Sequence, residues 1–142
     1  MATVSVSTPA KSEQKKSQDV LLDVRGLKTE FFLQQGIDHA VQGVDFKVNR
    51  GQTIGVVGES GCGKSVMARS IMAIVPQPGR VVEGQVLFHS SPDRRGGAGG
   101  EVVDMAAIDP MGAKARSIRG AEISMVFQEP MTSFSMNYTI GN

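Results

Sequence analysis

The residues from Gly58 to Ser65 read G-E-S-G-C-G-K-S and fit the pattern G-x-x-x-x-G-K-S/T without a gap. Glycines in such a stretch let the backbone curl until successive N–H groups converge, which makes a partly positive nest for phosphate oxygens. We predict a buried strand before it, Gln52–Val57, and a helix after it, Val66–Val75. Because the pattern requires this setting of strand, loop and helix, we favour a phosphate-binding loop in an α/β fold over an incidental glycine-rich turn.

The residue types in this loop have distinct expected roles. The free N–H groups and the dipole at the start of the following helix attract an anion. Lys64 is expected to reach the β- and γ-phosphates as a point charge, and the Ser65 hydroxyl to ligate Mg²⁺. Cys62 is either a thiol activated by the helix N-terminus or a small residue that points away from phosphate, and we favour the second. The predicted binding residues are Gly58, Glu59, Ser60, Gly61, Cys62, Gly63, Lys64 and Ser65.

Charge and composition argue against several kinds of partner. Lysine and arginine number 15 against 14 acidic residues, a net charge of +1, which favours no nucleic-acid partner. A single cysteine excludes an intramolecular disulfide framework. No apolar run reaches the roughly 18–20 residues of a membrane helix, so we expect a soluble chain. The 17 glycines indicate backbone close to a ligand, flexible loops, or both.

Extended segments are predicted on the N-terminal side of the loop. Residues 1–18 are rich in Ser, Thr, Lys and Gln without an apolar period, and are expected to form a disordered tail. Val20–Val24 and Leu27–Leu33 are predicted to be extended, with a turn at Gln34-Gln35-Gly36. Val41–Val48 alternates between apolar and polar residues, which predicts a strand with one buried face. Antiparallel strands therefore precede the buried strand of parallel-sheet character.

Shorter elements are predicted on the C-terminal side. Val81–Phe88 resembles a strand interrupted at Glu83-Gly84, and a flexible insertion rich in Gly and Arg follows over residues 90–104. Pro110–Arg119 favours a short basic helix, and Ile123–Phe127 a strand. We expect residues 19–142 to form an antiparallel β-subdomain beside the first part of a P-loop core.

The stretch from Leu21 to Gly141 resembles the ATP-binding subunits of ABC transporters, and among them the oligopeptide and dipeptide importer ATPases. Three blocks carry the resemblance: GESGCGKSVMARSIM (58–72), IRGAEISMVFQEPMTSF (118–134) and YTIG (138–141). The second block is the most diagnostic, because a phosphate-binding loop alone occurs in many families. The family binds ATP and Mg²⁺, so the resemblance implies both cofactors.

The resemblance also implies roles for two residues outside the loop. Gln128 falls at the Q-loop glutamine, which contacts Mg²⁺ and the attacking water; an amide can ligate with its oxygen and donate with its nitrogen. The alternative is a glutamine that merely ends an edge strand. Phe31 falls where the family stacks an aromatic ring on adenine, although Phe32 is adjacent and a plain core phenylalanine is the alternative.

The sequence departs from the family in places. Residues 134–137 read F-S-M-N where the subfamily has a Leu-Asn-Pro run. No LSGGQ-like signature and no apolar strand ending in Asp-Glu is found. His39 and His89 both precede Gln128, so neither is the switch histidine. We expect the N-terminal portion of a longer subunit that, expressed alone, is unstable and does not hydrolyse ATP.

The resemblance implies an importer that couples ATP hydrolysis to uptake of peptides or a related small solute. Its expected partners are transmembrane permease subunits, a second ATP-binding subunit and, indirectly, an extracytoplasmic solute-binding protein. The expected location is the cytoplasmic face of the inner membrane, as a peripheral subunit. The alternatives are a non-catalytic nucleotide-binding remnant, a soluble ABC-type ATPase outside transport, and a P-loop kinase of small molecules.

Overall fold

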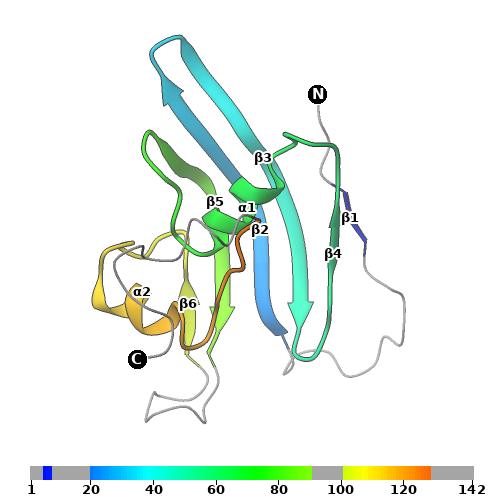
Figure 1. Ribbon diagram of the computed structural model, residues 1–142. Helices are drawn as coiled ribbons and strands as arrows, with labels where there is room; N and C mark the ends of the chain where they lie inside the picture. Colours follow the sequence, from blue (N-terminus) through cyan, green and yellow to red (C-terminus); the bar gives the residue numbers. More distant parts are fainter. Residues whose placement is uncertain (1–4, 8–19, 91–100, 129–142) are drawn as a thin grey trace, which may run out of the picture.

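The computed structural model describes residues 5–7, 20–90 and 101–128, and its largest element is a four-stranded antiparallel sheet in the order β3-β2-β5-β6 (Figure 1). The strands are β2 (Val20–Leu33), β3 (Gly36–Asn49), β5 (Gly79–His89) and β6 (Val102–Asp104). The predicted extended segments and the turn at Gln34-Gln35-Gly36 are confirmed: β2 and β3 form an antiparallel hairpin, with Phe31 directly opposite Asp38. A mixed α/β architecture with an antiparallel sheet is therefore confirmed.

The interruption predicted at Glu83-Gly84 is wrong, because β5 continues through Gly84. A Cβ atom at this position would lie 2.6 Å from the Gly26 carbonyl oxygen and from the Leu27 Cα, and its φ of +99° favours glycine. The pairing of β2 with β5 shifts register between Arg25 and Lys28. The glycine therefore lets two backbones approach at a bulge, and the strand continues through it.

The flexible insertion predicted over residues 90–104 is wrong at its C-terminal end. Its last residues form β6, which pairs Phe88 with Val103, so the segment does not remain a loop up to residue 104. Ordinary β-ladder hydrogen bonding extends to the Ser90 amide, which donates to the Glu101 carbonyl oxygen at 3.0 Å. Residues 91–100 lie outside the described part of the chain.

The strand predicted at Gln52–Val57 is shorter and more exposed than expected. Only Gly55–Val57 forms a strand, β4, which pairs antiparallel with β1 (Ser5–Ser7). Val57 is 65% exposed. Among the described strands only β1 borders β4, so no parallel neighbour buries it. β1 also places a strand inside the expected tail 1–18, whose other residues lie outside the description.

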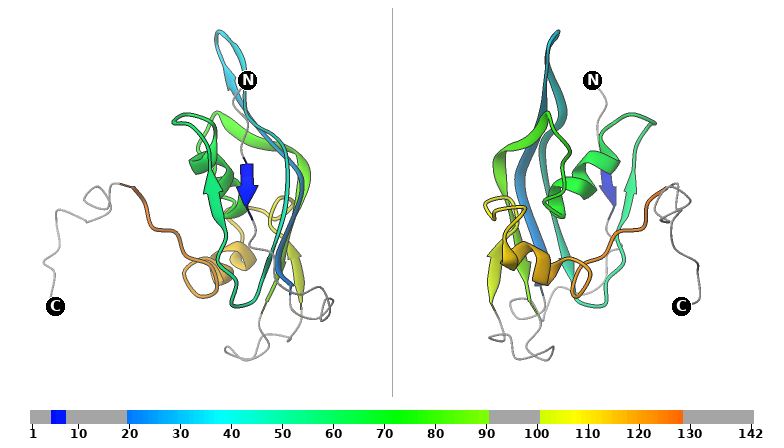
Figure 2. Two further views of the ribbon diagram at one scale, coloured as in Figure 1. Left: turned by 90° about the vertical axis from the view of Figure 1, so that its right-hand side faces the viewer. Right: turned by 60° about the vertical axis from the view of Figure 1, so that its left-hand side comes forward.

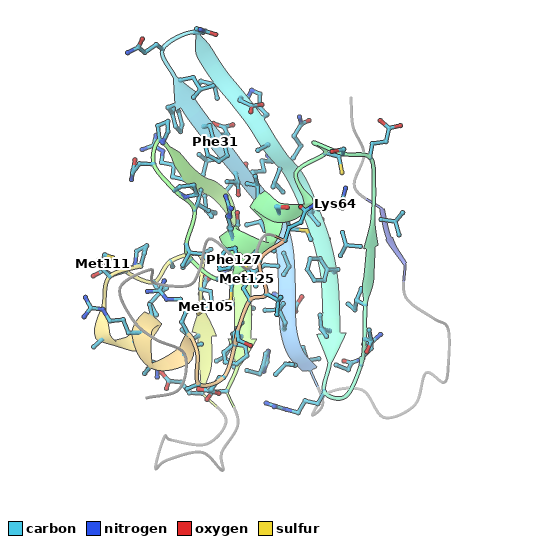
Figure 3. The ribbon with its side chains drawn as sticks, in the orientation of Figure 1. Phe31, Lys64, Met105, Met111, Met125 and Phe127 are labelled. Atoms are coloured by element: carbon cyan, nitrogen blue, oxygen red, sulfur yellow. The ribbon has the colours of Figure 1, made fainter. Side chains whose placement is uncertain are left out.

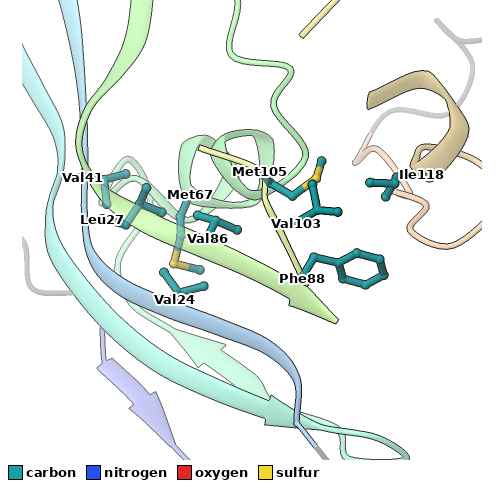
Figure 4. Packing of buried hydrophobic residues seen from close by; sticks show 9 residues of the cluster. All are labelled: Val24, Leu27, Val41, Met67, Val86, Phe88, Val103, Met105 and Ile118. Carbon is teal, nitrogen blue, oxygen red and sulfur yellow. The ribbon is translucent and has the colours of Figure 1, made fainter. Parts of the chain in front are cut away.

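The two described helices pack on the sheet around one apolar cluster. Helix α1 (Lys64–Ile71) ends four residues before the predicted Val75, and α2 (Ala113–Ile118) is the core of the predicted basic helix. Figure 4 shows Met67 of α1 against side chains of the sheet. Within the described residues no helix is long and apolar enough to cross a membrane. The buried cluster contains Val24, Leu27, Val41, Met67, Val86, Phe88, Val103, Met105 and Ile118.

A buried pair of hydroxyls fixes α1 to β2. Ser70 Oγ donates to the Val66 carbonyl oxygen at 2.8 Å, so the Thr29 hydroxyl donates in turn to Ser70 Oγ, also at 2.8 Å. Both residues are fully buried. Because a buried hydroxyl without a partner is costly, this pair restricts α1 to one position along the strand.

The strand predicted at Ile123–Phe127 is wrong. Ile123 makes an isolated bridge to Arg119, residues 124–127 have no regular structure, and Val126 is 91% exposed. No other described strand pairs with this segment. Without a partner its apolar, β-branched residues cannot form a ladder. Figure 2 shows the segment leading away from α2.

Candidate phosphate-binding site

The loop between β4 and α1 follows the path that its glycines allow. Gly61 and Gly63 have φ values of +82° and +89°, the left-handed region that favours glycine. A Cβ atom on Gly63 would lie 2.1 Å from the Ala40 carbonyl oxygen, so the loop packs directly on the backbone of β3. Gly63 is the N-cap of α1, and its carbonyl oxygen accepts from the Met67 amide at 2.8 Å. The sequence thus places the start of a helix against β3.

Lys64 folds back over the loop that precedes it. Its Nζ donates to the carbonyl oxygens of Gly58 and Glu59, each at 2.7 Å, and lies 3.4 Å from Cys62 Sγ. The first turn of α1 contains no acidic residue. The ammonium group and the helix N-terminus therefore concentrate positive charge at one point, which is suited to an anion.

A cavity of about 1030 Å³ opens between this loop and β3. Its size suits a ligand larger than a free phosphate ion, since typical small-molecule sites measure roughly 300–1,000 Å³. Of the predicted residues, those from Ser60 to Ser65 line it together with Phe31 and Gln128, whereas Gly58 and Glu59 do not. The remaining lining residues are those from Asp38 to Asp45 on β3, and Val66.

Phe31 and Phe32 have different surroundings. Phe31 lines the cavity, and its ring edge is so close to Gly79 that a Cβ there would lie 2.6 Å away. Phe32 is not among the lining residues; the Arg80 guanidinium lies 4.3 Å from its ring centroid. Figure 3 labels Phe31 on β2 and Lys64 at the start of α1. Phe31 is thus the ring available to a ligand in the cavity.

Gln128 reaches the cavity from the far end of the described chain. It is exposed and follows the irregular segment 124–127. Ser65 is also exposed and lines the same cavity. Mg²⁺ takes oxygen ligands, and substrate phosphates and waters usually supply several of them. A hydroxyl and an amide oxygen facing one cavity fit that requirement. Within the described residues no group of three His, Cys, Asp or Glu side chains could hold a metal by itself.

Cys62 is buried in the loop. It lines the cavity and touches the Lys64 ammonium group, so it is part of the cavity wall. That its side chain points away from bound phosphate stays a prediction.

The contribution of β3 to the cavity was missed. His39 lines the wall, and its Nδ1 lies 2.8 Å from Glu30 Oε1 on β2. Asp45 also lines the wall, and its Oδ1 accepts from the Gly26 amide at 2.8 Å. Nothing in the local pattern of β3 distinguishes a wall of a site from an ordinary edge strand. Only the close approach of Gly63 to the Ala40 backbone shows that β3 forms a wall of the cavity.

Comparison with known proteins agrees with this geometry. A model of the family described as "ABC transporter" matches residues 41–142. A probable peptide ABC transporter ATP-binding protein of Sinorhizobium fredii is 40% identical over 124 residues, 87% of this chain and 33% of that protein. A putative peptide import ATP-binding protein of Brucella ovis is 43% identical over 127 residues, 89% and 35% of the two chains. The dipeptide transport ATP-binding protein DppD of Bacillus subtilis is 37% identical over 123 residues, 86% and 32%. The chain spans about a third of the length of these relatives.

Proposed function

Because this chain belongs to the ABC transporter family, we propose that its cavity binds ATP with Mg²⁺, and that it serves as the ATP-binding part of an importer of peptides or a related small solute. The resemblance stated from the sequence is confirmed by the family match. One observation carries the proposal: Lys64, Phe31 and Gln128 come from three separate segments and line one cavity.

At the phosphate end, the loop amides and Lys64 bind the nucleotide. Lys64 Nζ now donates to two loop carbonyls, and phosphate oxygens would replace these as acceptors without moving the helix. Charge-assisted hydrogen bonds to phosphate are stronger than those to neutral carbonyls. The exchange therefore favours the bound state, and its strength depends on the single ammonium group of this loop.

Ser65 and Gln128 are the residues of the cavity that would hold Mg²⁺. The ion would neutralise phosphate charge, which is the main requirement of phosphoryl transfer. Gln128 has a further proposed role, because its amide nitrogen can donate to the attacking water while its oxygen ligates.

At the other end of the cavity, Phe31 is proposed to stack on adenine. Every base has a π-face, so stacking gives affinity with little selectivity. The Phe32 ring is occupied by Arg80, which supports the choice of Phe31.

The assembly is proposed from the relatives, whose names describe peptide import or dipeptide transport. We propose that the chain acts with transmembrane permease subunits and a second ATP-binding subunit, and indirectly with an extracytoplasmic solute-binding protein. Its place would be the cytoplasmic face of the membrane, as a peripheral subunit. Co-purification with permease subunits would support this role, since an ABC-type ATPase that works outside transport would not co-purify with them.

The test of the nucleotide site is titration of a fluorescent ATP analogue into the intact gene product. Lys64→Ala should weaken binding about 10- to 100-fold, from the roughly 1.5–3 kcal/mol of a hydrogen bond to a charged group. Lys114→Ala is the matched control, because Lys114 lies on α2 and pairs with Glu101 at the surface. Equal affinity of the Lys64 and Lys114 variants would refute the proposed site.

A further inference from the structure

Arg119 connects the end of α2 to the end of α1. Its Nη1 donates to the Ala73 carbonyl oxygen at 2.9 Å and to the Met72 carbonyl oxygen at 3.4 Å, and its Nη2 donates to the Pro110 carbonyl oxygen. The side chain is partly buried. One guanidinium group therefore joins two segments that are 46 residues apart in the chain.

The end of α1 needs this contact. The helix ends in a Schellman turn: the Ala73 amide donates to the Ser70 carbonyl oxygen at 3.1 Å, and the Ile74 amide to the Arg69 carbonyl oxygen at 2.9 Å. Beyond this turn, the carbonyl oxygens of Met72 and Ala73 accept from Arg119. Ala73 has a φ of +53° at the position where such turns favour glycine. A non-glycine residue persists there only where its surroundings hold it, and Arg119 is a group that does so.

Arg119 is also fixed through its own backbone. Its amide donates to the Ala115 carbonyl oxygen at 3.0 Å, and the residue forms a bridge with Ile123. The Gly120 amide donates to the Ile123 carbonyl oxygen at 2.8 Å, which closes the turn. The irregular residues 124–127 connect this turn to Gln128, which lines the cavity; the segment that leads there is orange in Figure 1. The turn that begins the path to Gln128 is thus held against the helix that begins with Lys64.

We propose that Arg119 is a positioning residue, which fastens the turn at residues 119–123, where the segment leading to Gln128 begins, to the C-terminal end of the helix whose N-terminal end carries Lys64 and Ser65. The phosphate loop and Gln128 then keep one relative placement. The inference rests on the proposed function for the chemical role of Gln128, but the placement itself is independent of any nucleotide.

The placement is tested by quenching in the intact gene product. These 142 residues contain no tryptophan and one cysteine. With Cys62→Ser, and with any other cysteine and tryptophan of the gene product replaced, a bimane on Gln128→Cys is quenched only at close range by a tryptophan at Gln42→Trp, which lines the same cavity from β3. Arg119→Gln should lose this quenching. Arg116→Gln, in the last turn of α2 and exposed, should retain it. Retained quenching in the Arg119 variant, or equal loss in both variants, would overturn the proposal.

Two further variants separate positioning from stability. Arg119→Lys serves as the test variant if Arg119→Gln does not fold. It keeps the charge but loses the planar fork of the guanidinium, so it should lose part of the quenching. Full quenching in the lysine variant contradicts the proposal. Ala73→Gly removes the strain at the turn. Combined with Arg119→Gln, it should restore the melting temperature but not the quenching. Restoration of both would reduce Arg119 to a structural cap.

The functional consequence is measured as the gain in ATP-analogue affinity on adding Mg²⁺. Arg119→Gln should reduce this gain about tenfold, within the range that a misplacement of 1 Å costs. In a Gln128→Ala background the same change should have no further effect, and an additive loss would contradict positioning. If Gln128→Ala itself leaves the gain unchanged, the proposed role of Gln128 fails while the quenching result still stands.

Discussion

Gly63→Ala and Gly61→Ala form a matched pair that separates backbone strain from steric contact. Both glycines have positive φ, +89° and +82°. An added Cβ atom at Gly61 meets nothing within 4 Å, whereas at Gly63 it lies 2.1 Å from the Ala40 carbonyl oxygen. The two substitutions are chemically identical and lie in the same loop. Their difference therefore reports the close approach of loop and strand.

The magnitudes follow from these contacts. Alanine in the left-handed region costs about 1–2 kcal/mol, partly offset by about 0.4–1 kcal/mol from the reduced entropy of the unfolded chain. Gly61→Ala should thus lower the free energy of unfolding by about 1 kcal/mol. At Gly63 the β3 backbone must also move by more than about 1 Å to reach ordinary contact, and overpacking of this kind adds roughly 1–3 kcal/mol. Gly63→Ala should therefore cost about 2–4 kcal/mol in all.

The assay is urea unfolding of the intact gene product without nucleotide, with hydrogen exchange of the β3 and α1 amides as the local readout. Faster exchange around Ala40 is expected for Gly63→Ala and not for Gly61→Ala. Equal destabilisation by the two substitutions, with unchanged exchange in β3, would refute the direct packing of the loop on this strand.

Three further changes test other parts of the structure. Phe31→Ala should weaken binding of a fluorescent ATP analogue by about 1–3 kcal/mol, and Phe32→Ala should not; the reverse result would shift the stacking residue by one. Asp23 is buried, and the hydrogen bond from the Arg25 guanidinium lowers the pKa of its carboxyl below the ordinary 3.8. A carboxyl whose pKa is lowered by folding stabilises the folded state above its ordinary pKa, and this stabilisation is lost as the pH falls through the lowered pKa. The free energy of unfolding should therefore fall less steeply with decreasing pH in Asp23→Asn. Ser70→Ala leaves the Thr29 hydroxyl without a partner and should cost about 1–3 kcal/mol, while adding Thr29→Val should cost less than the sum; strict additivity in a double-mutant cycle would contradict their coupling.

The predictable part of this protein is local in sequence. The loop from Gly58 to Ser65 and the hairpin of β2 and β3 follow from residue types and alternation alone. The walls of the cavity do not, because they depend on which strand the loop packs against. Gly84 shows the same limit. A glycine in a strand pattern suggests a break, but here it allows the close approach of the β2 backbone at a bulge, and the strand continues. Contacts between segments far apart in the chain therefore determine both the cavity walls and the continuity of β5.

Burial of an apolar strand is a property of its neighbours as much as of its residues. Gln52–Val57 has the composition of a strand covered on both faces, as in parallel sheets, yet Val57 is 65% exposed because β1 alone borders β4 among the described strands. The same reasoning applies to Val126, which is 91% exposed at the end of the path to Gln128. Both exposed positions flank the cavity segments, β4 before the phosphate loop and residues 124–127 before Gln128. The phosphate loop keeps its shape despite this exposure because Gly63 packs on β3 and Met67 packs in the core, so its geometry depends on the antiparallel sheet and not on β4.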